Sequence, residues 1–206
     1  MKNRELRQIE NLNIEVRADE ENNKRTIGGY AVKYNSPTLI VDRWGDKFLE
    51  EISAGAFDES LNTKRQKGLW NHESSKPLGS VKSGTLRFNS DTTGLNYDID
   101  VPNNSWGNDV FESVQRGDVD GSSFGFICLD NQWSKVTHEG KEIYKRSIIK
   151  AELLEVSPCT FPAYDSSEIG CRSFEVFKKE LEKPSLELEL EKERLRNKIL
   201  SMRGVN

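Results

Sequence analysis

Short runs of alternating polar and apolar residues, separated by Gly, Ser, Asn and Asp, fill most of this 206-residue chain. Side chains of a β-strand point alternately to its two faces, so such alternation predicts strands with one buried face. We predict strands at 12–16, 30–34, 68–72, 79–81, 85–89, 94–101, 122–129, 143–149 and 151–157. Many short strands of this kind predict a mainly β fold, either a compact, mostly antiparallel barrel or a sandwich.

Two segments interrupt the strand pattern and predict helices. A short helix follows the N-cap residue Ser53 and reaches about residue 61. Apolar residues gather on one side of a second helix over 106–116, and Gly117 is suited to end it. Residues 38–45 are predicted as a loop. The helices are few enough that the fold is α+β with β predominant.

From Phe174 onward the chain becomes densely charged and contains no glycine before Gly204. Pro184 marks a helix start, because proline is tolerated in the first helical turn. Apolar residues recur here every seven positions, at Leu181, Leu188, Leu195 and Met202. We therefore predict a domain over 1–173 and a charged, helical tail over 174–206. Two interpretations of the tail stay open: a solvated helix packed lightly on the domain, or an arm that binds a partner.

Composition argues against several classes of function. The net charge of -4 does not favour nucleic acid as the main partner, since nucleic-acid binding favours a clustered basic surface. No apolar run approaches the ~20 residues that a membrane span needs, and the polar N-terminus lacks the apolar core of a secretory signal. We expect a soluble, intracellular protein without membrane association. Cys128, Cys159 and Cys171 lack the close pairing of zinc ligands, which favours buried free thiols.

The segment 121–126 is the strongest candidate for chemistry. In a strand, Ser122, Phe124 and Phe126 share one face, while Ser123 and Gly125 share the other. The two phenylalanines anchor the first face in a core. The second face presents a hydroxyl beside a bare glycine, which leaves room for a peptide backbone to approach. Because a serine hydroxyl needs a base to act as a nucleophile, the pattern predicts a serine hydrolase.

The chain has two histidines, and they differ in context. His72 ends a predicted strand, where a general base could reach a neighbouring strand. A lone histidine is more often a structural polar residue, and that interpretation stays open for His72. His138 lies in a segment with the composition of a hairpin turn, so we expect it to be exposed and without a role.

A third residue would orient His72 and stabilise its charged form, as the acid does in serine-protease triads. In the run 151–157 the alternation groups Leu154 with Val156 and Glu155 with Ser157. If the apolar pair faces the core, Glu155 faces outward, as Ser123 does. Glu152 would share the core face and is the weaker candidate. A surface ion pair with a basic neighbour is the alternative role for Glu155.

Several short motifs, each weak alone, occur in an order and spacing that together are specific. They are Gly28-Gly29-Tyr30-Ala31-Val32, Ile52-Ser53-Ala54-Gly55-Ala56-Phe57, Asn71-His72-Glu73, Pro77-Leu78-Gly79-Ser80, Gly94-Leu95, Ser123-Phe124-Gly125-Phe126, Leu154-Glu155-Val156-Ser157 and Phe161-Pro162-Ala163-Tyr164. With these motifs the chain resembles the prohead (capsid maturation) proteases of tailed bacteriophages, relatives of the herpesvirus assemblins. The resemblance extends over residues 12 to 170, which is most of the predicted domain.

The resemblance implies a serine endopeptidase on an assemblin-like β-barrel. Such an enzyme would act in the host cytoplasm, inside the assembling procapsid, and cut scaffold, the scaffold-like part of the major capsid protein, and often itself. Carried over residue by residue, the family's base falls on His72 and its nucleophile on Ser123, with Ser122 as the other hydroxyl to consider. Assemblins use a second histidine as the third member, and this chain has none at a matching place, so Glu155 is our candidate.

By analogy with the basic residues of assemblins, Arg146 would support the oxyanion, together with backbone N–H groups near Gly125. The chemistry requires no metal and no cofactor. Whether activity needs a homodimer, as in assemblins, is left open. The non-enzymatic alternatives are a capsid-assembly or scaffold-associated protein that binds partners through its tail helix, and an inactive barrel that serves as a binding module.

Overall fold

The structure is a computed structural model that describes residues 4–9, 14–19, 24–41, 45–160, 174–179 and 194–196. The chain divides into two units, Met1–Ile169 and Gly170–Asn206. In the second unit, residues 174–179 and 194–196 are helical. The predicted helix start at Pro184 lies outside the described residues. So do three of the apolar residues that recur every seven positions: Leu181, Leu188 and Met202.

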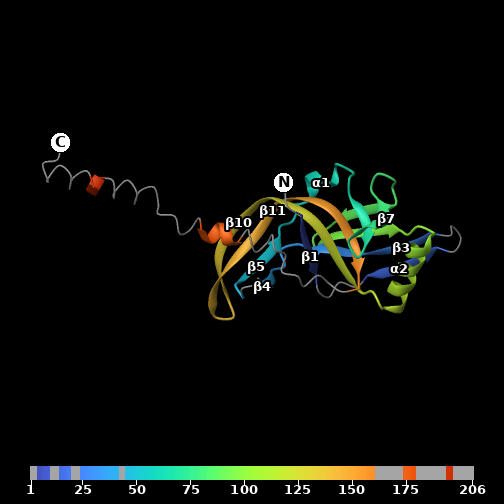
Figure 1. Ribbon diagram of the computed structural model, residues 1–206, viewed down its shortest axis with the longest axis horizontal. Helices are drawn as coiled ribbons and strands as arrows, with labels where there is room; N and C mark the ends of the chain where they lie inside the picture. The colour runs from blue at the N-terminus through green and yellow to red at the C-terminus, as the bar shows by residue number, and fades with distance from the viewer. Residues whose placement is uncertain are drawn as a thin grey trace. The chain divides into compact units, whose positions relative to one another are not determined.

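The first unit contains two sheets and two helices with described positions (Figure 1). Its strands are β1 (Glu5–Ile9), β2 (Glu15–Asp19), β3 (Lys24–Lys33), β4 (Thr38–Val41), β5 (Lys47–Ile52), β6 (Lys67–Trp70), β7 (Glu73–Ser80), β8 (Leu86–Ser90), β9 (Gly94–Asp100), β10 (Gly121–His138) and β11 (Lys141–Cys159). Its helices are α1 (Asp58–Leu61) and α2 (Ser105–Arg116).

The larger sheet has the order β1-β10-β11-β5-β4, and β6 joins it by pairing with both β11 and β7. The smaller sheet has the order β2-β3-β9-β8. Strand pairing is antiparallel except where β11 runs parallel to β5 and to β6. The isolated bridge between Tyr34 and Ile52 is also parallel. The mainly β, α+β class is confirmed. The prediction of a barrel was wrong, because the described strands form two sheets and neither sheet closes on itself.

Apolar side chains from both sheets form one core. The smaller sheet contributes residues such as Ile27, Leu95 and Tyr97, and the larger contributes the Phe124 and Phe126 rings. These two rings stack with centroids 5.4 Å apart, and Phe57, just before α1, meets them edge-on at 6.0 and 6.3 Å. Stacked and edge-to-face pairs are the favoured aromatic geometries. The predicted inward face of the serine strand is therefore confirmed.

Strands β10 and β11 form one long hairpin (Figure 1) where the sequence predicted three shorter strands. The register of this hairpin shifts between Gly125 and Phe126 and on both sides of Asp130. The unpaired extra residue is Leu154 or Ile149 on β11 and Leu129 on β10. Such a β-bulge reverses the alternation only in the strand that carries it, so Phe124 and Phe126 stay on one face. The alternation in the sequence is broken at these points, and the continuous strand could not be predicted from it.

Strands β1, β4 and β5 were not predicted, and residues 38–41 of the predicted loop 38–45 form β4 instead. Glu5 and Glu50 are buried although both are acidic. A strand that buries ionised side chains lacks the apolar alternation by which strands are recognised in sequence. By contrast, α2 matches its prediction: Asn104 accepts the Gly107 N–H at 2.8 Å as N-cap, and Gly117 ends the helix with a φ of 81°.

Candidate active site

His72 lies in a two-residue turn between β6 and β7. Trp70 pairs with Glu73, and the two residues between them, Asn71 and His72, have φ values of 50° and 62°. Positive φ at both loop residues is the pattern of a type I′ hairpin turn. Asparagine and histidine are among the residues that tolerate this left-handed conformation best.

The turn is held against β11. The Asn71 N–H donates to the Pro158 carbonyl at 3.1 Å, and the Asn71 side chain accepts the Thr160 N–H at 3.0 Å. The His72 N–H donates to the Ser157 hydroxyl at 3.3 Å. Backbone bonds from both turn residues therefore position the imidazole over the C-terminal end of β11.

The structure brings His72 and Glu155 together. Nδ1 of His72 lies 2.6 Å from Oε1 of Glu155, and the Glu155 side chain is 4% exposed. Glu155 sits on β11 opposite Gly125 of β10 and shares a face with Ser157, as predicted. Leu154 was wrongly expected in the core with Val156: it is the bulged residue and lines the cleft described below, and Leu153 is buried instead. A short bond between a histidine and a buried carboxylate is the arrangement that orients a general base.

Glu155 has partners on both of its oxygens. Oε1 also accepts from Nη2 of Arg4 at 2.5 Å, and Oε2 accepts the Ser157 hydroxyl at 2.6 Å. Burial by itself would raise the pKa of Glu155, but the hydrogen bond and charge of His72, with the bond from Ser157 and the charge of Arg4, lower it. The carboxylate is therefore ionised at neutral pH.

An ionised carboxylate can accept a hydrogen bond but cannot donate one, so Nδ1 of a neutral His72 carries the ring proton. That assigns the lone pair of the neutral imidazole to Nε2. Nε2 is buried and has no hydrogen-bond partner among the described residues. A buried, unpaired ring nitrogen is costly unless a reacting group occupies its hydrogen-bonding position. A neutral His72 thus presents a ring nitrogen with a lone pair and no partner in the described part of the chain.

The two serines of β10 point to opposite faces of the strand. Ser122 donates to the Tyr97 hydroxyl at 3.0 Å, and both groups are buried in the core. Ser123 lies opposite Ser157 of β11 and therefore on the same face as Glu155. Since Ser157 also binds the His72 N–H, Ser123 and His72 are both neighbours of Ser157. No hydrogen bond between Ser123 and His72 occurs in the described part of the chain.

The Ser123 hydroxyl is instead bonded to β1. It donates to the backbone carbonyl of Arg7 at 2.9 Å, and Ser123 is 0% exposed. β1 pairs with β10 in antiparallel register, with Gln8 opposite Ser123. The candidate nucleophile is therefore covered by the N-terminal strand.

Gly125 has a structural reason to be glycine. A Cβ atom built there would lie 2.5 Å from Oε1 of Glu155 and 2.8 Å from Nε of Arg4. Real Cβ atoms do not approach other atoms so closely, so the Glu155–Arg4 pair occupies the space that the missing side chain leaves. This space was predicted to admit a peptide backbone, and in the structure these two side chains fill it.

The fold does not place the Arg146 side chain beside Ser123. Its guanidinium is 2% exposed and donates to Glu5 at 3.0 Å and to Glu50 at 2.9 Å. Glu5 pairs with Phe126, so this ion cluster lies on the phenylalanine face of β10, opposite the face that carries Ser123. Arg146 is therefore part of a buried ion network and is unsuited to support an oxyanion at Ser123.

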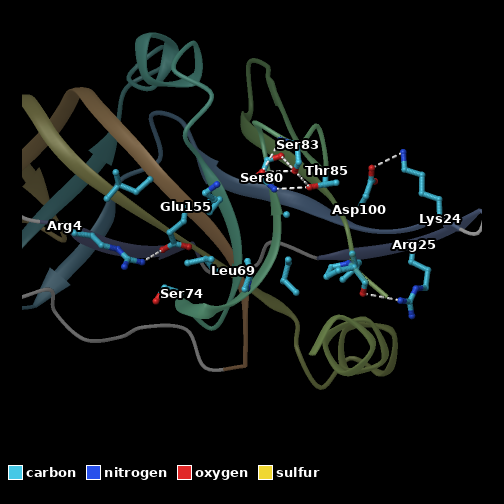
Figure 2. Close-up of a pocket in the computed structure, with 17 residues that line it drawn as sticks. Arg4, Lys24, Arg25, Leu69, Ser74, Ser80, Ser83, Thr85, Asp100 and Glu155 are labelled. Atoms are coloured by element: carbon cyan, nitrogen blue, oxygen red, sulfur yellow. Dashed lines mark hydrogen bonds and ion pairs between the residues drawn. The ribbon is translucent and has the colours of Figure 1, made fainter. Parts of the chain in front are cut away.

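A cleft of about 980 Å³ begins beside the Glu155–Arg4 pair. Figure 2 shows that pair at one end of the cleft and the Lys24–Asp100 ion pair toward the other. Between them, side chains of β6 and β7 such as Leu69 and Leu78 contribute apolar wall. The cleft therefore offers an apolar surface with charged ends next to the candidate acid.

Two residues of the site were missed as contributors. Ser157 binds both Glu155 and the His72 backbone, and its place on the Glu155 face was the signal that could have identified it. Arg4 precedes β1, and nothing in its sequence context indicated a partner 151 positions away. His138 ends β10 near the tip of the hairpin and is half-buried rather than exposed.

The described residues include two cysteines, and neither is in a disulfide. Cys128 and Cys159 are free, and burial raises the pKa of the Cys159 thiol to about 12. Cys171 lies outside the described residues. No group of three or more His, Cys, Asp or Glu side chains there is arranged to hold a metal ion. Within the same residues, no helix has the length and apolarity needed to cross a membrane.

A family model described as caudovirus prohead serine protease matches residues 12–180. No curated protein matches. Among solved structures, the bacteriophage T4 capsid assembly protease matches with 11% identity and a TM-score of 0.36, over 73% of this chain and 98% of that one.

Proposed function

Since this chain belongs to the caudovirus prohead serine protease family and is a serine peptidase of phage capsid maturation, we propose that Ser123, His72 and Glu155 form its catalytic triad. The observation that carries this assignment is Nε2 of His72, which is buried and has no hydrogen-bond partner in the described part of the chain, while Nδ1 is bound to Glu155. Family membership favours a peptidase over the two non-catalytic alternatives.

In the proposed reaction, Oγ of Ser123 attacks the carbonyl carbon of a scissile peptide bond as its proton passes to Nε2 of His72. Glu155 stabilises the resulting imidazolium. The tetrahedral intermediate collapses with cleavage of the C–N bond, and His72 returns the proton to the departing amine. Water then hydrolyses the acyl-serine ester by the same proton path. Backbone N–H groups of β10 near Gly125 are our candidates for the oxyanion donors.

The substrates that we propose are the scaffold and the scaffold-like part of the major capsid protein, with the enzyme's own chain as a further target. The site of action would be the procapsid interior in the host cell. The cleft beside Glu155 supports a polypeptide substrate, because an apolar wall with charged ends suits an extended segment of mixed sequence.

The test is co-expression of this chain with its proposed substrates, the major capsid protein and the scaffold, followed by mass spectrometry of the products. Wild-type protein should yield defined fragments. Ser123→Ala should abolish them, because that substitution removes the proposed nucleophile and no core volume. His72→Ala should be as damaging, since the two residues would act as one unit.

Ser122→Ala is the matched control. It removes a hydroxyl one position away and leaves the Tyr97 hydroxyl without its donor, so it should lower stability by about 1–3 kcal/mol and retain cleavage. Loss of cleavage in folded Ser122→Ala protein, with activity kept in Ser123→Ala, would overturn the assignment of the nucleophile.

A further inference from the structure

The strand that carries Ser123 has two edges, and described strands occupy both. β11 pairs with one edge, where Ser157 lies opposite Ser123. β1 pairs with the other, where Gln8 lies opposite Ser123. A peptide that binds beside Ser123 as an added strand needs an edge with free backbone groups. It could gain that edge here by taking the place of β1.

β1 contacts the proposed triad at two points. Its Arg7 carbonyl accepts the Ser123 hydroxyl at 2.9 Å, and Arg4, just before the strand, binds Glu155 at 2.5 Å. A backbone carbonyl of an extended strand thus lies against the nucleophile, as that of a substrate must. The hydroxyl proton is directed to this carbonyl oxygen and not to Nε2 of His72, so the contact is unreactive.

The opposite face of β1 is anchored by charge. Glu5 binds Arg146 at 3.0 and 3.2 Å, and Arg7 binds both Glu5 and Glu50. All four side chains are almost fully buried. Buried charges are tolerated when oppositely charged partners lie close to them, so the Glu-x-Arg order of β1 is matched to Arg146 and Glu50.

We propose that β1 is a built-in occupant of the peptide-binding edge of β10, and that the enzyme is inactive until this strand is displaced. The edge then accepts an extended peptide in antiparallel register, and it favours an acidic residue two positions before a basic one. Arg146 and Glu50 are the specificity-determining residues. They pair with each other at 2.9 Å in the structure, so each still has a partner when the strand leaves. This inference rests on the proposed role of Ser123.

The experiment measures covalent labelling of Ser123 by a fluorophosphonate, in which the serine oxygen displaces fluoride from phosphorus. A specific protease site is inserted between β1 and β2 of the full chain. The folded protein is then cut, and the N-terminal fragment is removed by gel filtration. Labelling should become at least about tenfold faster, as expected if the strand is displaced no more than about a tenth of the time.

A synthetic peptide of sequence NRELRQIE, added to the cut protein, should slow labelling again. The control peptide NRRLEQIE has the same composition and charge but exchanges the acidic and basic positions, and it should have little effect. In the uncut chain, the double substitution Glu5→Gln with Arg7→Gln removes the anchoring charges and should also speed labelling. This variant decides the question if the cut protein unfolds.

Equal labelling rates before and after strand removal, or an unchanged rate in the folded double variant, would overturn the inference and leave the proposed function intact. Equal inhibition by the two peptides would overturn the Glu-x-Arg preference. Absence of Ser123 labelling in every form, together with absence of capsid-protein cleavage, would instead contradict the proposed function.

Discussion

At the scale of single residues, the interpretation of Glu155 as the third member of the triad can be tested by removing its charge alone. Glu155→Gln keeps the shape of the side chain but no longer stabilises a charged His72. We expect the cleavage rate to fall on the order of 10²–10⁴-fold, a smaller loss than for Ser123→Ala. The measurement is the initial rate of cleavage of a capsid-protein fragment. A rate equal to wild type would show that Glu155 acts only as an ion-pair partner.

The dependence of stability on pH in the acid range follows from two buried carboxylates, Glu50 and Glu155. Burial alone would raise the pKa of Glu50, but Arg7 and Arg146 lower it, and burial is likewise outweighed at Glu155 by His72, Ser157 and Arg4. A carboxyl with a lowered folded pKa binds fewer protons when folded than when unfolded. Its stabilising contribution is therefore complete above the unfolded pKa of about 4.3 and is lost as pH falls through the folded value.

We expect the free energy of unfolding in urea to decline from about pH 5 downward. The Glu155→Gln protein should lose less of it over that interval than wild type, because the titrating carboxyl is gone. Tryptophan fluorescence at a series of pH values provides the measurement. A variant whose decline matches that of wild type would contradict the role assigned to this carboxyl.

At the scale of elements, the hairpin turn between β6 and β7 positions the imidazole. Asn71→Val should destabilise the protein by about 1–2 kcal/mol, because a β-branched residue at a φ of 50° is strained. Asn71→Gly relieves that strain while also losing the bond to the Thr160 N–H, so it is the matched control and should cost less. Thermal unfolding compares the two. Equal losses would show that the side-chain bond, and not the backbone conformation, is decisive.

The buried charge cluster joins β1, β5 and β11, and removal of one of its charges leaves an opposite charge buried without enough partners. Arg146→Met leaves Glu5 and Glu50 to share Arg7, and we expect a loss of about 3–5 kcal/mol in the free energy of unfolding. Urea denaturation is the measurement, with Lys135→Met at an exposed ion pair as control. If the two substitutions cost the same, the cluster is not a stabilising feature.

At the scale of the whole molecule, the first unit should be separable from the tail. We predict that a chain ending at residue 173 folds and keeps its Ser123-dependent peptidase activity. We also predict that this shortened chain fails to enter proheads. A charged helix is marginal in water by itself, so the tail is expected to bind a partner there. Limited proteolysis of the Ser123→Ala protein and particle sedimentation check the two halves of this statement. A tail as resistant as the first unit, with aggregation of the shortened chain, would show that the tail belongs to the core.

The sequence by itself determined the mainly β class, α2 and the face of each serine, because local alternation, capping residues and side-chain periodicity depend on neighbours along the chain. The same alternation placed Glu155 on the face that binds His72, 83 positions away. The local sequence around Glu155 indicates the face on which this residue lies, but it does not indicate a partner so far away along the chain.

The tertiary structure alone decided the roles of Arg146, Gly125, Arg4 and β1. Arg146 looked available in sequence, yet two buried carboxylates from distant strands hold it. Gly125 accommodates a carboxylate rather than an empty space. Strand β1 could not be predicted from the sequence because its buried residues are charged. The burial of these charges is favourable only when partners from β5 and β11 surround them. Pairing between distant segments cannot be inferred from periodicity, since periodicity records which face is buried and not what covers it.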